Sequence, residues 1–252
     1  MIIKIDHIAL SSGDFEKTFK TLDLLGYERV FFEQNVPNLL IKRELLAKFS
    51  PSHSISLLKC GENLNIEILN HGNINSGKSF IIPIFENTPA SFLNNLVRIE
   101  DLYSTSEKNY GFNADIQVLN KPDCSGFIFT KIKMLTENIL DSVIFWKHFG
   151  FKLTTCTDES AILEFSSIIN RNPYQLHLKR VEHVKTESFL DDAGFNCIAF
   201  VSTSLKRDMT FFKDQNIPIT DIGTLTLDNK KINLFFCKGL YGEPIEIVEV
   251  LF

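Results

Sequence analysis

The sequence has no long apolar run and no cluster of basic residues. No stretch approaches the about 18 consecutive apolar residues that a membrane-spanning helix needs, so we expect no membrane partner. The 26 Lys and Arg are scattered among 31 Asp and Glu, and the net charge is -5. Nucleic acids attract proteins through clustered cations. We therefore expect no nucleic-acid partner either.

Cysteine pairs are also lacking. The five cysteines are scattered and form no CxxC pair, which argues against a zinc-thiolate site and against a disulfide framework. The opening stretch MIIKIDHIAL carries charges within its apolar run, unlike a secretory signal. Together these absences indicate a cytoplasmic protein with reduced thiols.

Aromatic residues, by contrast, are abundant, with 23 Phe in 252 residues. Hydrophobic residues make up 44% and charged residues 23% of the chain, as in ordinary soluble globular proteins. The length suffices for one large domain or two ordinary ones. We expect cores or pockets that are walled by aromatic rings.

A strand followed by an amphipathic helix is predicted at the start of the chain. Residues 2–10 are rich in β-branched and aliphatic side chains, which favours a strand. Residues 11–14 supply serine and aspartate, which are good N-caps, and apolar residues then recur at helical spacing over 15–25. Gly26 is placed to end the helix in the left-handed conformation.

The same pattern returns twice, starting at residues 127 and 195, with Thr136 or Asn138 and then Ser204 as the expected caps. Asn is the second-best residue for the left-handed conformation that ends a helix. The strand position and the helix-ending position are 19 residues apart in every copy. The matching pairs are His7 with Gly26, Lys131 with Gly150, and Cys197 with Asn216.

Three more strand-like segments follow each helix, so that the repeated unit is strand, helix and three strands. A fourth, degenerate copy is expected between residues 71 and 125, and an insertion at 38–49 looks helical. The expected strands lie near 27–33, 54–60 and 63–70, then 151–157, 160–166 and 174–180, and finally 217–225, 231–237 and 244–251.

The stretches IDHIAL, LLGYE, FWKHFGFKL, GFNCIAF and GEPIEIVEV, in this order and spacing, resemble the vicinal oxygen chelate superfamily. That superfamily includes glyoxalase I, the bleomycin-resistance proteins and the extradiol dioxygenases. The resemblance implies an α+β fold of repeated βαβββ modules that form two curved mixed sheets around cavities. It also implies two domains of two units each, at 1–122 and 123–252.

In this superfamily, metal ligands lie on the first and last strands of the units, and the metal holds two neighbouring oxygens of a substrate. The resemblance places His7, Glu67 and, by the echo of IEILN in IQVLN, Gln117 at such positions. A divalent metal is therefore expected in the first domain. The alternative is a packing histidine that is hydrogen-bonded to Glu67 across the cavity.

In the second domain the corresponding positions hold Lys131, His177 or Gln175, Cys197 and Glu246. Only Glu246 matches the superfamily outright, and the ammonium of Lys131 would repel a divalent ion. We therefore expect a metal-free cavity in which Lys131 and Glu246 are catalytic and His177, Gln175 and Cys197 bind substrate. The alternative for Lys131 is an exposed position on an edge strand.

Two classes of function follow. The first is a glyoxalase- or dioxygenase-like enzyme that transforms a small polar organic molecule, and the second is a metal-free binding or drug-sequestering protein like the bleomycin-resistance members. A homodimer is compatible with both. Trp146 is expected in the core, and four histidines are expected at solvated positions: His53, His71, His148 and His183.

Overall fold

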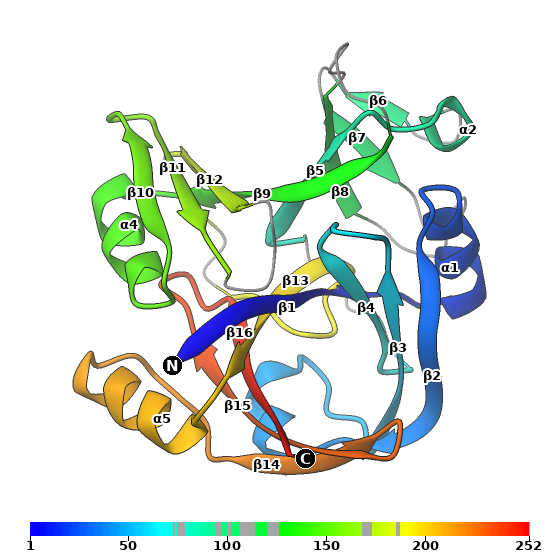
Figure 1. Ribbon diagram of the computed structural model, residues 1–252, viewed down its shortest axis with the longest axis vertical. Coiled ribbons are helices and arrows are strands. Elements are labelled where there is room, and N and C mark those ends of the chain that lie inside the picture. The colour runs from blue at the N-terminus through cyan, green and yellow to red at the C-terminus, as the bar shows by residue number, and fades with distance from the viewer. Residues whose placement is uncertain are drawn as a thin grey trace.

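The computed structural model describes residues 1–72, 74, 79–93, 97–99, 102–105, 114–119, 126–167, 173–184 and 187–251. Within these residues there are sixteen strands, and each α-helix follows the first strand of a unit and precedes the other strands of that unit, as expected (Figure 1). The first unit comprises β1 (Ile2–Ser11), α1 (Phe15–Asp23), β2 (Glu28–Pro37), the 3-10 helix η1 (Leu40–Leu45), β3 (Ser52–Lys59) and β4 (Asn65–Asn70).

The second unit is the degenerate one. It comprises β5 (Ile81–Glu86), the short helix α2 (Ala90–Leu93), β6 (Val97–Ile99), β7 (Leu102–Thr105) and β8 (Ala114–Leu119). The third comprises β9 (Ile128–Thr136), α4 (Ile139–Lys147), β10 (Lys152–Cys156), β11 (Ser160–Phe165) and β12 (Tyr174–Arg180). The fourth comprises β13 (Gly194–Ser202), α5 (Leu205–Asp214), β14 (Gly223–Leu227), β15 (Lys230–Lys238) and β16 (Pro244–Leu251). The predicted α+β class and the βαβββ module are confirmed.

Local sequence sets the helix ends. Asp14 caps α1 by accepting a hydrogen bond from the backbone N–H of Lys17, at 3.0 Å. Asn138 caps α4 in the same manner. The left-handed residues after the helices are those predicted, with φ of 85° at Gly26, 95° at Gly150 and 56° at Asn216.

The strands form two eight-stranded sheets. The β1 sheet has the order β14-β15-β16-β13-β1-β4-β3-β2, and the β5 sheet has the order β10-β11-β12-β9-β5-β8-β7-β6. The first unit therefore shares a sheet with the fourth, and the second shares one with the third. The expected pairing of first with second and third with fourth, which underlay the domains 1–122 and 123–252, is wrong.

The reason is that the first strands of two units pair antiparallel at the middle of each sheet, and sequence spacing does not choose the partner. β1 pairs with β13, with His7 opposite Ala199. β5 pairs with β9, with Ile84 opposite Lys131. The expected seam near 120–128 lies mostly outside the described residues.

Two apolar clusters hold the sheets. The larger one includes the buried Trp146, as expected, and fills the space between helices and sheets. The smaller one lies on the side of β1 that carries Ala9 and includes Leu45, the last residue of η1, and Leu46, which follows it. In Figure 1 the β1 sheet curls around the light-blue chain that contains η1, so the insertion fills part of the inside of this sheet.

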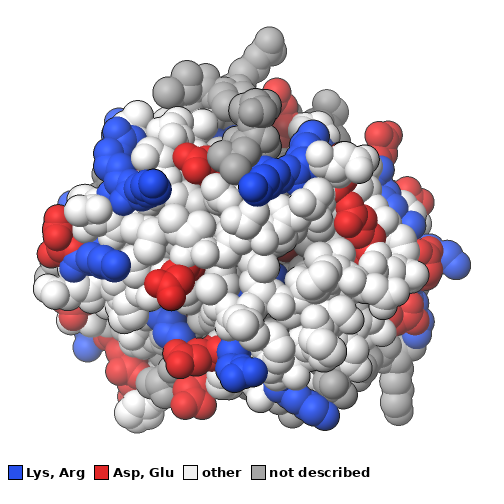
Figure 2. Space-filling model, turned by 90° about the horizontal axis from the view of Figure 1, so that it is seen from below, with Lys and Arg blue, Asp and Glu red and all other residues white. Residues whose placement is uncertain are grey.

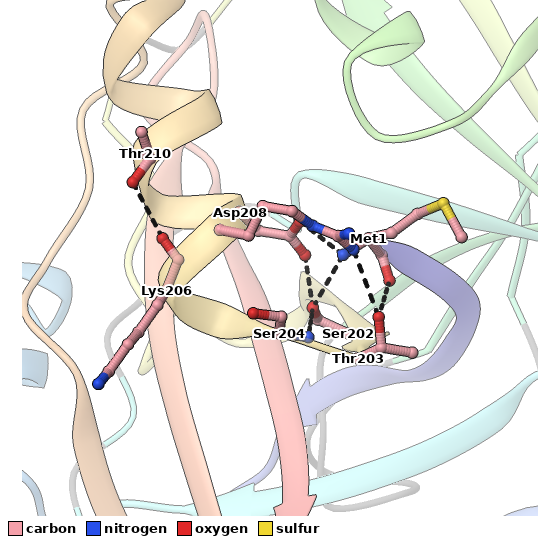
Figure 3. Close-up of polar contacts among 8 residues, drawn as sticks. Met1, Ser202, Thr203, Ser204, Lys206, Asp208 and Thr210 are labelled. Atoms are coloured by element: carbon pink, nitrogen blue, oxygen red, sulfur yellow. Dashed lines mark hydrogen bonds and ion pairs between the residues drawn. The ribbon is translucent and has the colours of Figure 1, made fainter.

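Further contacts join the first unit to the fourth. The amino group of Met1 lies 2.7 Å from Asp208 Oδ1 in α5, and Ser202 donates a hydrogen bond to the other oxygen of that carboxylate (Figure 3). Charges of both signs are interspersed among wide uncharged areas on the face shown in Figure 2. In the described part of the chain, no helix is long and apolar enough to cross a membrane.

Candidate metal centre

A β-bulge in β1 brings two adjacent residues to one cavity. The pairing of β1 with β13 shifts register between Ile5 and His7. Successive side chains of a regular strand point to opposite faces, but a bulge re-aims one of them. Asp6 and His7 consequently both line the same cavity.

Two carboxylates from different units meet at His7. Its Nε2 lies 3.4 Å from Glu67 Oε2 and 3.6 Å from Glu246 Oε2. All three side chains are buried, and their ligand atoms lie within 4.8 Å of one another. Nε2 makes no hydrogen bond in the described chain. Burying a polar nitrogen without a hydrogen-bond partner costs free energy. A proton or a metal ion shared by His7, Glu67 and Glu246 would remove that cost.

The strand register explains why these residues meet. His7 on β1 is opposite Ala199 on β13, and Ala199 is in turn opposite Glu246 on β16. Glu67 on β4 is opposite Ala9. Directly opposite residues share a face of the sheet. The two alanines therefore leave space into which the longer His and Glu side chains converge.

The charges around His7 decide its protonation. Burial on its own would lower the pKa of His7, but the charge of Glu67, the hydrogen bond of the imidazole with Asp6 and the nearby carboxylate of Glu246 outweigh burial and raise that pKa well above its usual value. The pocket thus strongly attracts a cation, whether that cation is a proton or a metal.

Asp6 contacts the imidazole of His7 at Nδ1, the nitrogen that does not face the two glutamates. His7 Nδ1 lies 3.2 Å from Asp6 Oδ2, and Lys4 lies 2.6 Å from the other oxygen of this carboxylate. Although burial would raise the pKa of Asp6, the hydrogen bond and charge of His7, together with Lys4, lower it below the usual range. A carboxylate behind a metal-binding histidine fixes the ring orientation and directs the other nitrogen to the metal.

The donor set fits a divalent metal ion. Ligand atoms about 2.0–2.2 Å from one ion lie roughly 3–4 Å apart, and the distances from His7 Nε2 to Glu67 and to Glu246 fall in this range. One imidazole and two carboxylates are ligands that first-row divalent metals accept. His7, Glu67 and Glu246 would hold the ion, and Asp6 would orient His7.

The centre opens to the surface through two connected spaces. The inner cavity has a volume of about 100 Å³ and is lined by the three donor residues together with apolar side chains of β3, β14, β15 and β16. An outer vestibule of about 850 Å³ shares Asp6, Phe31, Leu57, Leu227 and Ile232 with it. The two spaces therefore adjoin one another at these five residues, on the side of the centre that carries Asp6.

The β5 sheet carries a counterpart of the centre whose residues differ. Lys131 on β9 is opposite Ile84 on β5, and Ile84 is opposite Gln117 on β8. This succession repeats that of His7, Ala199 and Glu246. His177 is opposite Lys133, as Glu67 is opposite Ala9. The register thus places Lys131, Gln117 and His177 at the positions that hold His7, Glu246 and Glu67 in the other sheet.

These placements correct the expected groupings of site residues. Gln117 lies in the β5 sheet and does not join His7 and Glu67, and Glu246 takes that third place. Lys131, His177 and Gln175 are likewise in the β5 sheet, so they do not share the cavity of Glu246. The chain spacing aligned the units correctly, but the wrong units were combined.

The other four residues of the site expected in the second domain have their own partners or surroundings. Lys131 forms an ion pair of 2.7 Å with Glu86 on a central strand, so the edge-strand alternative is wrong. Gln175 donates to Glu164, at 2.8 Å, and lies 3.2 Å from His177. Cys197 is in the β1 sheet, but burial, followed by the negative charges of Glu246 and Glu67, raises the pKa of its thiol well above the usual value.

The sequence matches no protein-family model, and no curated protein is significantly similar to it. Solved structures are similar. Glyoxalase I from Zea mays is 14% identical with a TM-score of 0.61, covering 98% of this chain and 92% of that chain. A mutant of the same maize protein is 15% identical with a TM-score of 0.63, covering 98% and 93%.

A protein from Bacillus subtilis that is described as a presumed dioxygenase is 11% identical with a TM-score of 0.62, covering 98% of this chain and 85% of that chain. The likeness thus extends over both sheets. The chain has the glyoxalase I fold. The resemblance drawn from the sequence is confirmed at the level of this fold.

Sequence reasoning also missed a buried polar wall beside the centre, which consists of His53, His71 and Lys42. His53 and His71 are buried, 4% and 3% exposed, although both were expected at solvated positions. Their rings stack at 5.1 Å. Lys42, from the insertion, is buried beside them and lines the cavity. The alternation of His53 with Ile55 in β3 was a usable signal for an inward-facing histidine.

Proposed function

We propose that the protein is a metal-dependent enzyme that transforms a small organic molecule with two neighbouring oxygen atoms. The observation that carries the proposal is the convergence of His7, Glu67 and Glu246 at the inner end of a cavity that opens to solvent. A divalent metal bound there supplies Lewis-acid stabilisation to an anion that develops on the substrate oxygens. The similarity to glyoxalase I and to the presumed dioxygenase supports the fold on which this chemistry occurs.

The ratio of ligands favours proton-transfer chemistry over oxygen activation. Non-haem iron oxygenases typically use two histidines and one carboxylate. This centre has one histidine and two carboxylates, so the donors are harder and carry more negative charge. We therefore propose a lyase or isomerase type of reaction, in which a proton moves at a carbon beside the bound oxygens.

The residues around the proposed metal site would have distinct roles in such a reaction. Asp6 fixes the ring of His7, and each glutamate presents one oxygen to the ligand cluster. The second oxygen of Glu67 or Glu246 is then available to accept a proton from the substrate. The apolar side chains of the cavity wall, such as Leu234 and Val248, limit the water around that proton.

Elemental analysis of the purified protein tests the proposal. We expect a stoichiometric divalent metal in the wild type and its loss in His7→Gln and in Glu246→Gln. His177→Gln is the matched control, because His177 occupies the counterpart of the Glu67 position in the β5 sheet, and it should retain the metal. Undiminished metal in the His7 and Glu246 variants would contradict the proposed centre.

The alternative function is a metal-free binding protein without catalysis. It predicts that the wild type contains no metal under any loading condition, yet binds a small molecule in the same cavity. The catalytic role first expected for Lys131 and the substrate-binding roles expected for His177, Gln175 and Cys197 required one metal-free cavity shared with Glu246, and the separation of these residues between two sheets removes that cavity. A homodimer stays a prediction for either function.

A further inference from the structure

Lys42 places a positive charge in the wall of the metal-centre cavity. The residue is 5% exposed and lines the same inner cavity as His7, Glu67 and Glu246. It comes from η1, the insertion that lies inside the curve of the β1 sheet (Figure 1). An ammonium is rarely buried without a partner, since desolvation of the charge is costly.

The fold anchors the segment that carries Lys42. The backbone N–H of Leu190 donates to the carbonyl of Leu45 at 2.8 Å. The carboxylate of Asp191 accepts hydrogen bonds from the backbone N–H groups of Ala47 and Lys48 at 2.7 and 3.1 Å. These bonds anchor the end of the insertion to the chain before β13. A ligand would therefore meet a buried lysine on an anchored segment, which limits the cost of ordering it on binding.

Within the described residues, Lys42 makes no ion pair, and its Nζ lies 5.8 Å from the ring centroid of Phe236. Its polar neighbours are neutral histidines. Burial, followed by the charge of Lys42, lowers the pKa of His53 to about 2 and that of His71 to about 3. Nδ1 of His53 and Nε2 of His71 are also buried without a hydrogen-bond partner. Among the described residues, Lys42 is thus the cation of this cavity lining, and none of the carboxylates that line the cavity forms an ion pair with it.

We propose that Lys42 binds the carboxylate of the substrate, and that the substrate is a small 2-hydroxy or 2-oxo carboxylic acid. This inference rests on the function proposed above and names its substrate class. In such an acid, the 2-oxygen and a carboxylate oxygen are neighbours that can face the His7, Glu67 and Glu246 group. The negative charge of the substrate carboxylate then lies close to the cavity wall that carries the ammonium of Lys42.

The dimensions of the site agree with a small reacting group. The inner cavity of about 100 Å³ is small beside the roughly 300–1,000 Å³ of typical ligand pockets. It accommodates a carboxylate and one adjacent oxygenated carbon, while the vestibule of about 850 Å³ accommodates whatever substituent follows. The surplus negative charge of the two glutamates would repel such an anion if Lys42 and a bound metal did not offset it.

Glycolate and its neutral isostere glycolamide are suitable probes, measured by calorimetric titration against the full chain, both loaded with Mn²⁺ and after chelation. Lys42→Met keeps the apolar stem and removes only the charge. Lys48→Met is the matched control, because Lys48 is in the same segment but exposed. The Mn²⁺ content of each variant is measured in parallel and reports an intact centre.

We expect wild type and Lys48→Met to bind glycolate, and Lys42→Met to bind it at least about tenfold more weakly with unchanged Mn²⁺ content. Glycolamide should bind weakly to all three. Equal affinity of Lys42→Met and wild type for glycolate, or no binding of glycolate to the wild type, would overturn the inference. If no variant holds Mn²⁺ but glycolate binding still depends on Lys42, the proposed metal-dependent function fails and the anion site stands.

Discussion

Glu67 and Glu246 approach the same nitrogen of His7, at 3.4 and 3.6 Å, from the first and the fourth unit of the chain. Neither unit provides the donor group alone. The shared sheet places β4 and β16 on either side of the β1–β13 pair, so that both carboxylates reach inward across an alanine. The centre is consequently a property of how the units combine.

Metal removal should destabilise the protein. A ligand that binds only the folded state stabilises it by about 2.7 kcal/mol at a concentration 100-fold above its Kd. Thermal melts with and without a chelator, followed by added Mn²⁺, should show a reversible shift in the wild type. Glu67→Gln should show none, whereas Gln117→Glu, in the other sheet, should behave as the wild type. A wild-type response in Glu67→Gln would contradict the assignment.

The ion pair of Lys131 with Glu86 should matter for stability and not for the metal. Glu86 is 2% exposed, so Lys131→Met leaves a buried carboxylate without its ammonium and should cost about 3 kcal/mol of unfolding free energy. Adding Glu86→Leu to that variant should recover part of the loss. Lys179→Met, which affects an exposed pair of 3.9 Å with Glu159, is the control and should change stability little. Denaturant unfolding measures all three.

Glu243 should make stability depend on pH. Burial raises its pKa from 4.5 to about 7, although its carboxylate accepts a hydrogen bond from the backbone N–H of Tyr241. Between these two values the folded state binds more protons than the unfolded state, so stability falls as pH rises. Glu243→Gln should remove this fall and gain about 2 kcal/mol over wild type between pH 5 and pH 8.

Unfolding by denaturant at several pH values measures this gain. The exposed Glu62→Gln is the control and should keep the slope of the wild type. If the difference between Glu243→Gln and wild type does not change with pH, Glu243 is not the group responsible.

Asn216 should tolerate glycine better than alanine. Its φ of 56° is left-handed, and the residue is exposed, so packing does not confound the comparison. The left-handed conformation costs a residue with a Cβ roughly 1–2 kcal/mol, and Asn relieves part of that cost by local hydrogen bonding. We expect Asn216→Ala to lose about 1 kcal/mol in thermal melts and Asn216→Gly to lose little. Gln215→Ala, one residue earlier at a negative φ, should be close to neutral.

The sequence was informative wherever the physical cause is local. Caps, helix faces and left-handed ends depend on residues a few positions apart, so Asn138, Trp146 and Asn216 were placed correctly. Strand boundaries depend more on long-range pairing, and β14 begins at Gly223 where a strand from 217 was expected. The partner of β1 depends on contacts between distant units, which the local pattern does not encode.

A signal for the correct pairing was nevertheless present. The first and fourth units keep His7, Glu67 and Glu246 at the ligand positions, whereas the second and third have Ile82, Gln117, Lys131 and His177 there. Grouping the units by the metal-ligand residues that they retain pairs the first unit with the fourth. His53 and Lys42 were harder to assign, because their burial depends on an insertion that the repeat does not explain.

The antiparallel pairing of β1 with β13 has a consequence for synthesis. On the ribosome, the edge of β1 that faces β13 stays unpaired until residues 194–202 have emerged, and Glu246 follows later still. Pairings between distant segments form slowly, because a long loop must close first, and an unpaired strand edge invites association with other chains. A nascent chain cannot capture the metal with all three donors until its fourth unit has docked, so metal uptake would report that both halves of the β1 sheet have joined.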